Sequence, residues 1–517
     1  MRHLLVLTGM LAAAAAAPPQ VPPAAPPFRV EEATIAQLHD AMKSGRLTCR
    51  ALVDTYLRRI YAYDKNGPGL NAIVVVNPEA QKEAEALDRR FAQSGLSGPL
   101  HCIPAIVKDN FETVGLQSAG GSLSLKGFVS NKDAFQVKRI REAGAIVLAK
   151  SNMAEFAFSP YETVNSLLPG YTRNPYALDR VTAGSSGGTA AAVAANLGAI
   201  GLGSDTGNSI RGPSAHQALV GIRSTMGLTS RAGVIPLSLL ADIAGPMTRT
   251  VADAAAVLQV VAGEDADDPA TAAARGRAIP VYTDALQREG LRGARIGVLR
   301  QAYERETTDP EVVDVFMAAI EDLRRGGAVI VDPARVELAD VPRPQGAACG
   351  GFKYDINRYL AAAGDRVPVH TLEEIIKSRR FHPSIEARLR SAQDGPENGP
   401  DTPECQADAA YRERFRAAVA RTMDSNRLDA FVYPTWSNPP RLIGDLNTPH
   451  GDNSQVFAPT TGWPAISVPM GYTRGTLPAG MTFFGRAWTE PTLIRLAYAY
   501  EQATRHRHPP AAAPPLR

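Results

Sequence analysis

Short apolar runs alternate with helical stretches along the chain, and this alternation constrains the possible fold more than any other feature. The runs IPAIVKD, GAIVLAK and AIGLGSD, which begin at residues 103, 144 and 199, are bounded by glycine, proline or charged residues, as buried strands are. Residues 34–45, 49–64 and 78–92 instead repeat their apolar side chains with the period of a helix. Such alternation favours an α/β layer fold with a mostly parallel or mixed sheet.

The sequence also predicts where the first helix begins and where the last helix ends. Thr34 and Gln37 form a capping box at the start of the first helix. Near the other end, residues 429–436 and 464–472 are predicted strands, and residues 491–504 are a closing helix. The fold is therefore expected to extend to about residue 505.

The first residues are typical of a secretory signal. Arg2 precedes an apolar stretch from Leu4 to about Ala17 that ends in an Ala-x-Ala pattern. We predict a signal peptide over residues 1–17, cleaved after Ala16 or close to it, and a secreted or periplasmic protein. A low-complexity tail is the alternative. The stretch is too short to span a bilayer, so no membrane association is expected.

Charge and cysteine content exclude some classes of function and leave others open. Lys and Arg number 55 against 52 Asp and Glu, and no basic block occurs, so a nucleic-acid partner is not expected. The four cysteines, Cys49, Cys102, Cys349 and Cys405, match no zinc spacing, and no metal is predicted. They allow three full disulfide pairings, but buried thiols are an equally good interpretation.

Small residues are concentrated between residues 183 and 214, in AGSSGGTAAAVAANLGAIGLGSDTGNSIRGPS. Glycines let a substrate approach backbone N–H groups closely, which an oxyanion-binding site requires. A phosphate-binding loop is one interpretation, but the stretch lacks the lysine of a P-loop and the spacing of a dinucleotide site.

Two further interpretations assign a nucleophile. Gly184 to Gly188 matches the G-x-S-x-G elbow of α/β-hydrolases, with Ser186 as nucleophile, although a polar turn precedes it where a strand is needed. A Cys-His pair of His101 and Cys102 is another interpretation, but adjacent residues of an extended chain point to opposite faces and would not meet. The remaining interpretation combines both serine clusters with a distant lysine.

That combination resembles the amidase-signature hydrolases. The resemblance rests on GPLHCIPAIVKDNFET, AGSSGGTAAAVAANLG, GSDTGNSIRGPS, GWPAISVPMGY and FFGRAWTEPTLIRLAYAYEQAT, and covers roughly residues 30–505. It implies a single large α/β domain with a mixed, mostly parallel β-sheet core covered by α-helices. We assign this domain to residues 29–507, between a Pro-rich linker at 18–28 and a Pro-rich tail at 508–517.

The resemblance also implies a catalytic triad. Ser209 corresponds to the nucleophile, Ser185 to the bridging serine held by a cis peptide, and Lys108 to the base. A serine hydroxyl needs a base, and a lysine serves only when it is neutral, so the pKa of Lys108 must be lowered by burial. The apolar run before Lys108 suits that burial.

Four backbone N–H groups are the implied donors of an oxyanion hole, those of Thr206, Gly207, Asn208 and Ser209. The chain carries Asn208 and Cys102 where glycine is common in the family. Asn tolerates unusual backbone angles, so the hole can survive, but substrate access beside Asn208 is expected to narrow.

Supporting roles are assigned to side chains around these positions. Asp205 and Arg211 are expected to brace the nucleophile loop by hydrogen bonds, and Ser186 and Thr189 to cap the helix that follows them. The predicted pocket walls are aromatic residues near the motifs, namely Phe156, Phe158, Tyr161 and Trp436.

By resemblance, the chain is an amidohydrolase that cleaves a C–N amide bond through an acyl-serine intermediate and releases ammonia or an amine. No cofactor or metal is implied, the partner is a small-molecule amide, and a monomer or homodimer is expected. A serine esterase or carbamate hydrolase on the same triad is the alternative, and a catalytically inactive periplasmic binding protein is a third possibility.

Overall fold

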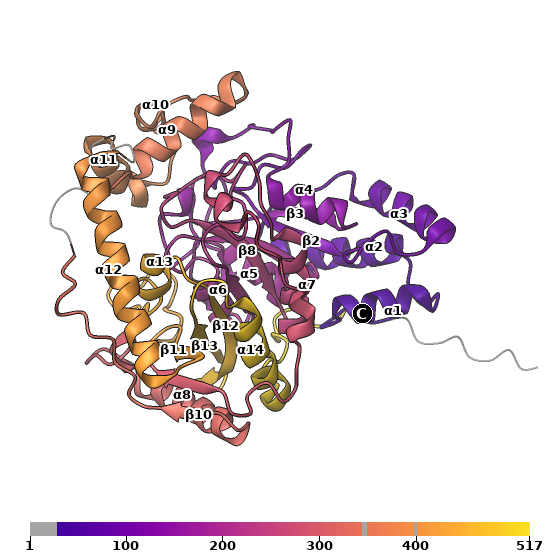
Figure 1. Ribbon diagram of the computed structural model, residues 1–517. Helices are drawn as coiled ribbons and strands as arrows, with labels where there is room; N and C mark the ends of the chain where they lie inside the picture. The colour runs from indigo at the N-terminus through magenta and orange to yellow at the C-terminus, as the bar shows by residue number, and fades with distance from the viewer. Residues whose placement is uncertain (1–27, 344–348, 396, 398–400, 517) are drawn as a thin grey trace, which may run out of the picture.

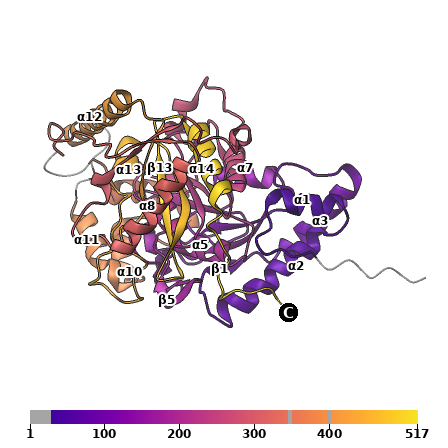
Figure 2. The ribbon, with the colours of Figure 1, turned by 90° about the horizontal axis from the view of Figure 1, so that it is seen from below.

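The computed structural model describes residues 28–343, 349–395, 397 and 401–516, and the predicted signal peptide and most of the linker lie outside these residues. A mixed sheet occupies the middle of the molecule, and helices surround it (Figure 1). In both Figure 1 and Figure 2 the first three helices project on one side, and helices α10 to α12 lie on the opposite side. The predicted α/β class and single domain are confirmed.

The sheet has 11 strands in the order β1-β3-β2-β6-β8-β7-β12-β13-β11-β9-β10, and β4 and β5 form a separate hairpin. The strands are β1 (Ile73–Val76), β2 (Pro104–Lys108), β3 (Ile146–Ser151), β4 (Arg173–Asn174), β5 (Ala177–Val181), β6 (Ile200–Asp205), β7 (Val220–Arg223), β8 (Ile243–Thr248), β9 (Arg295–Val298), β10 (Val329–Val331), β11 (Ala430–Pro434), β12 (Ala465–Thr473) and β13 (Leu477–Phe484).

The sheet is mixed, as expected, but parallel pairing does not predominate. Parallel pairs join β3, β2 and β6 at one end and β11, β9 and β10 at the other. The pairs between β6 and β11, across β8, β7, β12 and β13, are antiparallel. The short connection between β12 and β13 explains part of this difference, because neighbouring strands joined by a tight turn must be antiparallel.

Fourteen α-helices are described: α1 (Ile35–Lys43), α2 (Cys49–Ile60), α3 (Ala80–Ser94), α4 (Phe135–Glu142), α5 (Gly187–Ala194), α6 (Arg211–Ala215), α7 (Val251–Val261), α8 (Pro310–Arg325), α9 (Phe352–Ala363), α10 (Leu372–Ser378), α11 (Glu386–Asp394), α12 (Pro403–Asn426), α13 (Phe457–Thr461) and α14 (Glu490–Thr504). The capping box of Thr34 and Gln37 is confirmed at the start of α1. None of the helices in the described part of the chain is long and apolar enough to cross a membrane.

Helices α9, α10 and α11 share a second apolar cluster, separate from the main core. Phe156 and Phe158, which follow β3, pack against Phe352 of α9 in this cluster, which also contains Leu389 of α11. The ring centroids of Phe158 and Phe352 are 4.6 Å apart in an edge-to-face arrangement. This cluster holds the helices beside the loops that leave β3, and these loops form part of the candidate site.

All four cysteines form disulfides, Cys49 with Cys102 and Cys349 with Cys405, so the open choice between thiols and disulfides is resolved in favour of disulfides. Cys102 has a φ of 58°, in the left-handed region that favours glycine. This conformation explains why glycine suits the position. Because its sulfur is bonded to Cys49, Cys102 cannot act as a thiol nucleophile.

The predicted Pro-rich tail contacts the fold near its end. The buried guanidinium of Arg59 donates hydrogen bonds to the carbonyl oxygens of Ala513 and Pro514, at 2.9 and 3.0 Å. Ala513 is itself buried. The tail is therefore anchored to α2 rather than free of the core.

Candidate active site

Lys108 is the last residue of β2, and its side chain is completely buried. Strand β2 pairs in parallel with β6, so Lys108 lies near Ser204 at the carboxyl end of the neighbouring strand. Its Nζ is 2.7 Å from Ser185 Oγ and 2.8 Å from Ser204 Oγ. The side chain of Asn110 also donates to Ser204 Oγ, at 3.0 Å, and thereby fixes that hydroxyl.

Burial lowers the pKa of Lys108 to about 7, against the opposing effect of the Asp242 and Asp205 carboxylates. A large fraction of the amine is therefore neutral near neutral pH and can accept a proton. The apolar run before Lys108 predicts this direction of the pKa shift, and the complete burial of the side chain agrees with it.

Ser185 lies two residues before the start of α5, after a cis peptide bond between Gly184 and Ser185. Gly184 is packed so closely that an added Cβ would come within 2.5 Å of the carbonyl oxygens of Ser159 and Glu162. A glycine is therefore required for the turn that carries Ser185. The Ser185 side chain is completely buried and accepts the hydrogen bond from Lys108.

Ser209 lies in the loop between β6 and α6. The N–H of Ser186 donates to the carbonyl oxygen of Ser209 at 3.3 Å, which brings the loop next to the turn that carries Ser185. Ser209 lines a cavity that opens beside this loop, whereas Ser186 does not. The structure thus brings Lys108, Ser185 and the Ser209 loop together, as the sequence predicted.

The backbone N–H groups of Thr206, Gly207, Asn208 and Ser209 donate no hydrogen bond to any acceptor in the described part of the chain. Backbone donors at a buried site are normally paired, so unpaired donors in a row are available to a ligand. Together they can bind an oxygen that carries negative charge.

Asp205, the last residue of β6, holds the loop that carries Ser209 in place. Its carboxylate accepts hydrogen bonds from the backbone N–H groups of Ile210 and Arg211, at 3.2 and 3.3 Å. It also pairs with the guanidinium groups of Arg211 and Arg223, at 3.1 and 3.0 Å. Burial alone would raise the pKa of Asp205, but the two guanidinium groups lower it to about 2. The predicted partner Arg211 is confirmed, and Arg223 was missed because it comes from β7.

Asn208 does not need an unusual backbone angle, since it is not among the residues with positive φ. Its side chain is buried, and Nδ2 donates to Asp452 Oδ1 at 2.8 Å. The departure from glycine therefore ties the nucleophile loop to the loop that carries Asp452. Asn208 also lines the cavity, and whether it narrows the approach of a substrate stays a prediction.

The capping role predicted for Ser186 and Thr189 is wrong. Ser186 occupies the N-cap position of α5 but makes no side-chain capping bond, and its hydroxyl donates to the carbonyl oxygen of Ser204 at 3.2 Å. Thr189 bonds to Ser151 of β3 at 2.7 Å. Both hydroxyls therefore tie α5 to the sheet instead of closing the end of the helix.

The cavity beside Ser209 has a volume of about 360 Å³. Of the predicted wall residues, Phe158 and Tyr161 line it, but Phe156 and Trp436 do not. Phe156 is buried in the second apolar cluster. Trp436 stacks on His216 with ring centroids 4.6 Å apart and donates to the carbonyl oxygen of Gly212 at 3.1 Å.

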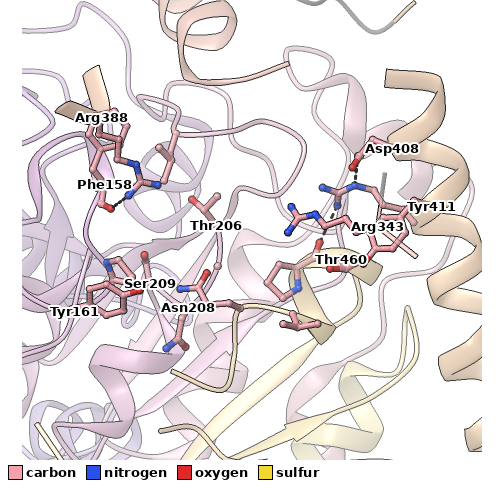
Figure 3. Close-up of a pocket in the computed structure, with 18 residues that line it drawn as sticks. Phe158, Tyr161, Thr206, Asn208, Ser209, Arg343, Arg388, Asp408, Tyr411 and Thr460 are labelled. Atoms are coloured by element: carbon pink, nitrogen blue, oxygen red, sulfur yellow. Dashed lines mark hydrogen bonds and ion pairs between the residues drawn. The ribbon is translucent and has the colours of Figure 1, made fainter. Parts of the chain in front are cut away.

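Figure 3 shows the wall that sequence analysis missed, which comes from residues between 343 and 460. It includes the polar side chains Arg343, Arg388, Asp408, Tyr411, Arg412, Gln455 and Thr460. Helix α12 contributes Asp408, Tyr411 and Arg412, at successive turns of one face. No local motif marks these residues, which come from segments far apart in the sequence and meet at the cavity only in the folded chain.

The amino-acid sequence matches the family model described as Amidase over residues 51–494. The chain belongs to the amidase family. It is accordingly an amidase-signature hydrolase of carbon–nitrogen bonds, as the resemblance implied.

Relatives of the family match over almost the whole chain. A probable amidase of Arabidopsis thaliana is 34% identical, over 93% of this chain and 92% of its own. A glutamyl-tRNA(Gln) amidotransferase subunit of Synechococcus sp. is 31% identical, over 91% of this chain and 96% of its own. Among solved structures, a peptide amidase from Stenotrophomonas maltophilia is 38% identical, covers 93% of this chain and 98% of its own, and superposes with a TM-score of 0.82.

Proposed function

We propose that this amidase cleaves its substrate by nucleophilic attack of Ser209, with Ser185 as proton relay and Lys108 as base. The observation that carries the proposal is the 2.7 Å contact between Lys108 Nζ and Ser185 Oγ, next to the loop on which Ser209 faces the cavity. A neutral lysine whose pKa is lowered by burial is the base that such an arrangement needs.

The proposed reaction has two stages, acylation of Ser209 and hydrolysis of the acyl-enzyme. Ser209 Oγ forms a bond to the amide carbonyl carbon, and its proton passes to Ser185 while the Ser185 proton passes to Lys108. The carbonyl oxygen becomes an oxyanion held by the N–H groups of residues 206–209. When the C–N bond breaks, the proton returns from Lys108 through Ser185 to the leaving nitrogen. Water then attacks the acyl-Ser209 ester by the same proton path and releases the carboxylic acid.

The substrate is proposed to be a small linear amide, that is, one whose C–N bond is not part of a ring, and its hydrolysis releases ammonia or an amine. The cavity of about 360 Å³ fits a small molecule or the end of a peptide, but not a folded partner. The solved relative described as a peptide amidase supports the same size class.

Covalent labelling tests the nucleophile and separates an enzyme from a binding protein that has lost catalysis. Fluorophosphonate treatment is expected to add one phosphonyl group at Ser209, located by peptide mass spectrometry, and to abolish hydrolysis of a panel of aliphatic, aryl and peptide amides. Labelling at Ser186 would support the elbow interpretation instead. The absence of both labelling and hydrolysis would contradict the proposed function.

We also propose that the protein is exported after removal of residues 1–16 or a similar segment. The two disulfides support this proposal, because such bonds persist in oxidising compartments. Expressed with its native N terminus, the protein is expected to have an intact mass lower than the full chain by the signal segment. Alkylation should find no free thiol before reduction and four after it. A full-length cytosolic protein with free thiols would contradict export.

A further inference from the structure

The cavity beside Ser209 carries an excess of positive charge. Three arginines line it, Arg343, Arg388 and Arg412, together with one carboxylate, Asp408. Asp408 is already paired with Arg412, with Oδ2 and Nε 2.6 Å apart. In Figure 3 Asp408 and Arg343 lie on the side of α12, and Arg388 lies on the other side, near Phe158.

Arg388 has no carboxylate partner among the described residues. Its guanidinium donates one hydrogen bond to the carbonyl oxygen of Phe158, and its carbon lies 4.9 Å from the centroid of the Phe158 ring. Arg388 is exposed to solvent where it lines the cavity, and among its neighbours only the Tyr161 phenol opposes the lowering of its pKa by the surrounding protein. The charge of Arg388 is therefore uncompensated, and its guanidinium has further N–H groups that can bind a ligand.

We propose that Arg388 selects substrates whose acyl half carries a carboxylate, so that the preferred substrates are anionic amides. This inference rests on the proposed function, because it assumes that Ser209 attacks an amide in the same cavity. A planar guanidinium binds a carboxylate through two parallel hydrogen bonds, which gives geometric selectivity as well as attraction. Arg343 adds a second positive charge to the cavity and favours the same class of substrate.

Primary monoamides of linear dicarboxylic acids test the proposal directly. Ammonia is their leaving group, so the carboxylate necessarily belongs to the acyl half. Each is compared with the ω-hydroxy alkanamide of equal length, over a series of chain lengths that samples the reach from Ser209 to Arg388. For the best length, wild-type kcat/KM is expected to be at least tenfold higher for the anionic amide, and this advantage should shrink as salt is added.

Arg388→Gln is expected to lower kcat/KM of the anionic amide by about 10- to 100-fold and to leave that of the neutral amide within about threefold. Arg388→Lys, which keeps the charge but not the fork, should retain part of the preference. The matched control is Arg390→Gln on the same helix, because Arg390 does not line the cavity and pairs with Glu386, at 2.7 Å. This control should leave both rates unchanged.

Each outcome decides between selectivity and a structural role. An equal loss for both amides in Arg388→Gln would mean that Arg388 only supports Phe158, and it would overturn the proposal. Equal or better hydrolysis of neutral amides by the wild type would overturn it too, while leaving the proposed function intact. Failure to hydrolyse any amide, together with an unlabelled Ser209, would instead contradict the proposed function itself.

Discussion

Ser209→Ala is expected to lower kcat/KM by about four to six orders of magnitude. The substitution removes the atom that attacks, and members of a cooperating catalytic unit lose almost the whole effect of the unit when one is removed. Ser209 is 4% exposed, and the loop around it is held by Asp205, so a change from hydroxyl to hydrogen leaves the fold intact. Initial rates on the best amide of the panel measure the loss, with the concentration of each protein taken from its absorbance, because the variant lacks the serine that a fluorophosphonate labels.

Ser186→Ala is the matched control for this variant. The Ser186 side chain is completely buried and does not line the cavity, and its hydroxyl bonds to the backbone of Ser204 and not to Ser209. We expect a loss of about tenfold or less, since one buried hydrogen bond typically contributes about 0.5–1.5 kcal/mol. An inactive Ser186→Ala beside an active Ser209→Ala would reverse the assignment of the nucleophile.

The parts of the site that sequence analysis found are those encoded in short motifs. Lys108 ends an apolar strand, and Ser185 and Ser209 lie in loops whose small residues are needed locally, as the packing around Gly184 illustrates. A turn that only glycine can occupy leaves a signal in the sequence itself. Such signals survive without knowledge of the rest of the fold.

The parts that were missed depend on contacts between distant segments. Arg223 reaches Asp205 from a strand that lies further along the chain, and Arg388 and Asp408 reach the cavity only because α11 and α12 pack over it. Arginine and aspartate on a helix surface are ordinary, and nothing in their spacing distinguishes cavity residues from solvated ones. The aromatic residue Trp436 was misassigned for the converse reason, because aromatic side chains near a motif are commonly core residues.

In the sheet, likewise, local features were predicted and contacts between distant segments were not. The strands themselves were predicted from apolar runs bounded by breaking residues, and β2, β3 and β6 lie where expected. Their order was not predictable, since β6 pairs with β8 and β7 with β12 across long stretches of chain. Alternation of helices and strands favours parallel pairing only for consecutive units, and the antiparallel middle of the sheet does not consist of such units.

The pH dependence of kcat/KM is expected to rise tenfold per pH unit below about pH 7 and to reach a plateau above it. The competent free enzyme holds Lys108 as a neutral amine, and burial lowers the pKa of Lys108 to about 7. Below that pH the ammonium form predominates and cannot accept the proton of Ser185. An unperturbed lysine, with a pKa of about 10.4, would instead place the rise at strongly alkaline pH.

Lys108→Ala should remove this rise and most of the activity, by about the same factor as Ser209→Ala, because both act in one unit. The matched control is the other buried lysine, Lys150, whose pKa is also lowered by burial. Its Nζ donates to Ser118 Oγ at 2.8 Å and to the carbonyl oxygen of Phe111, and not to Ser185. A folded Lys150→Met variant is therefore expected to keep the rise near pH 7. The measurement is the profile of kcat/KM from pH 5 to 9. A flat wild-type profile, with chemistry rate-limiting, would argue against a lysine base. Loss of the rise in Lys150→Met but not in Lys108→Ala would show that the rise belongs to Lys150.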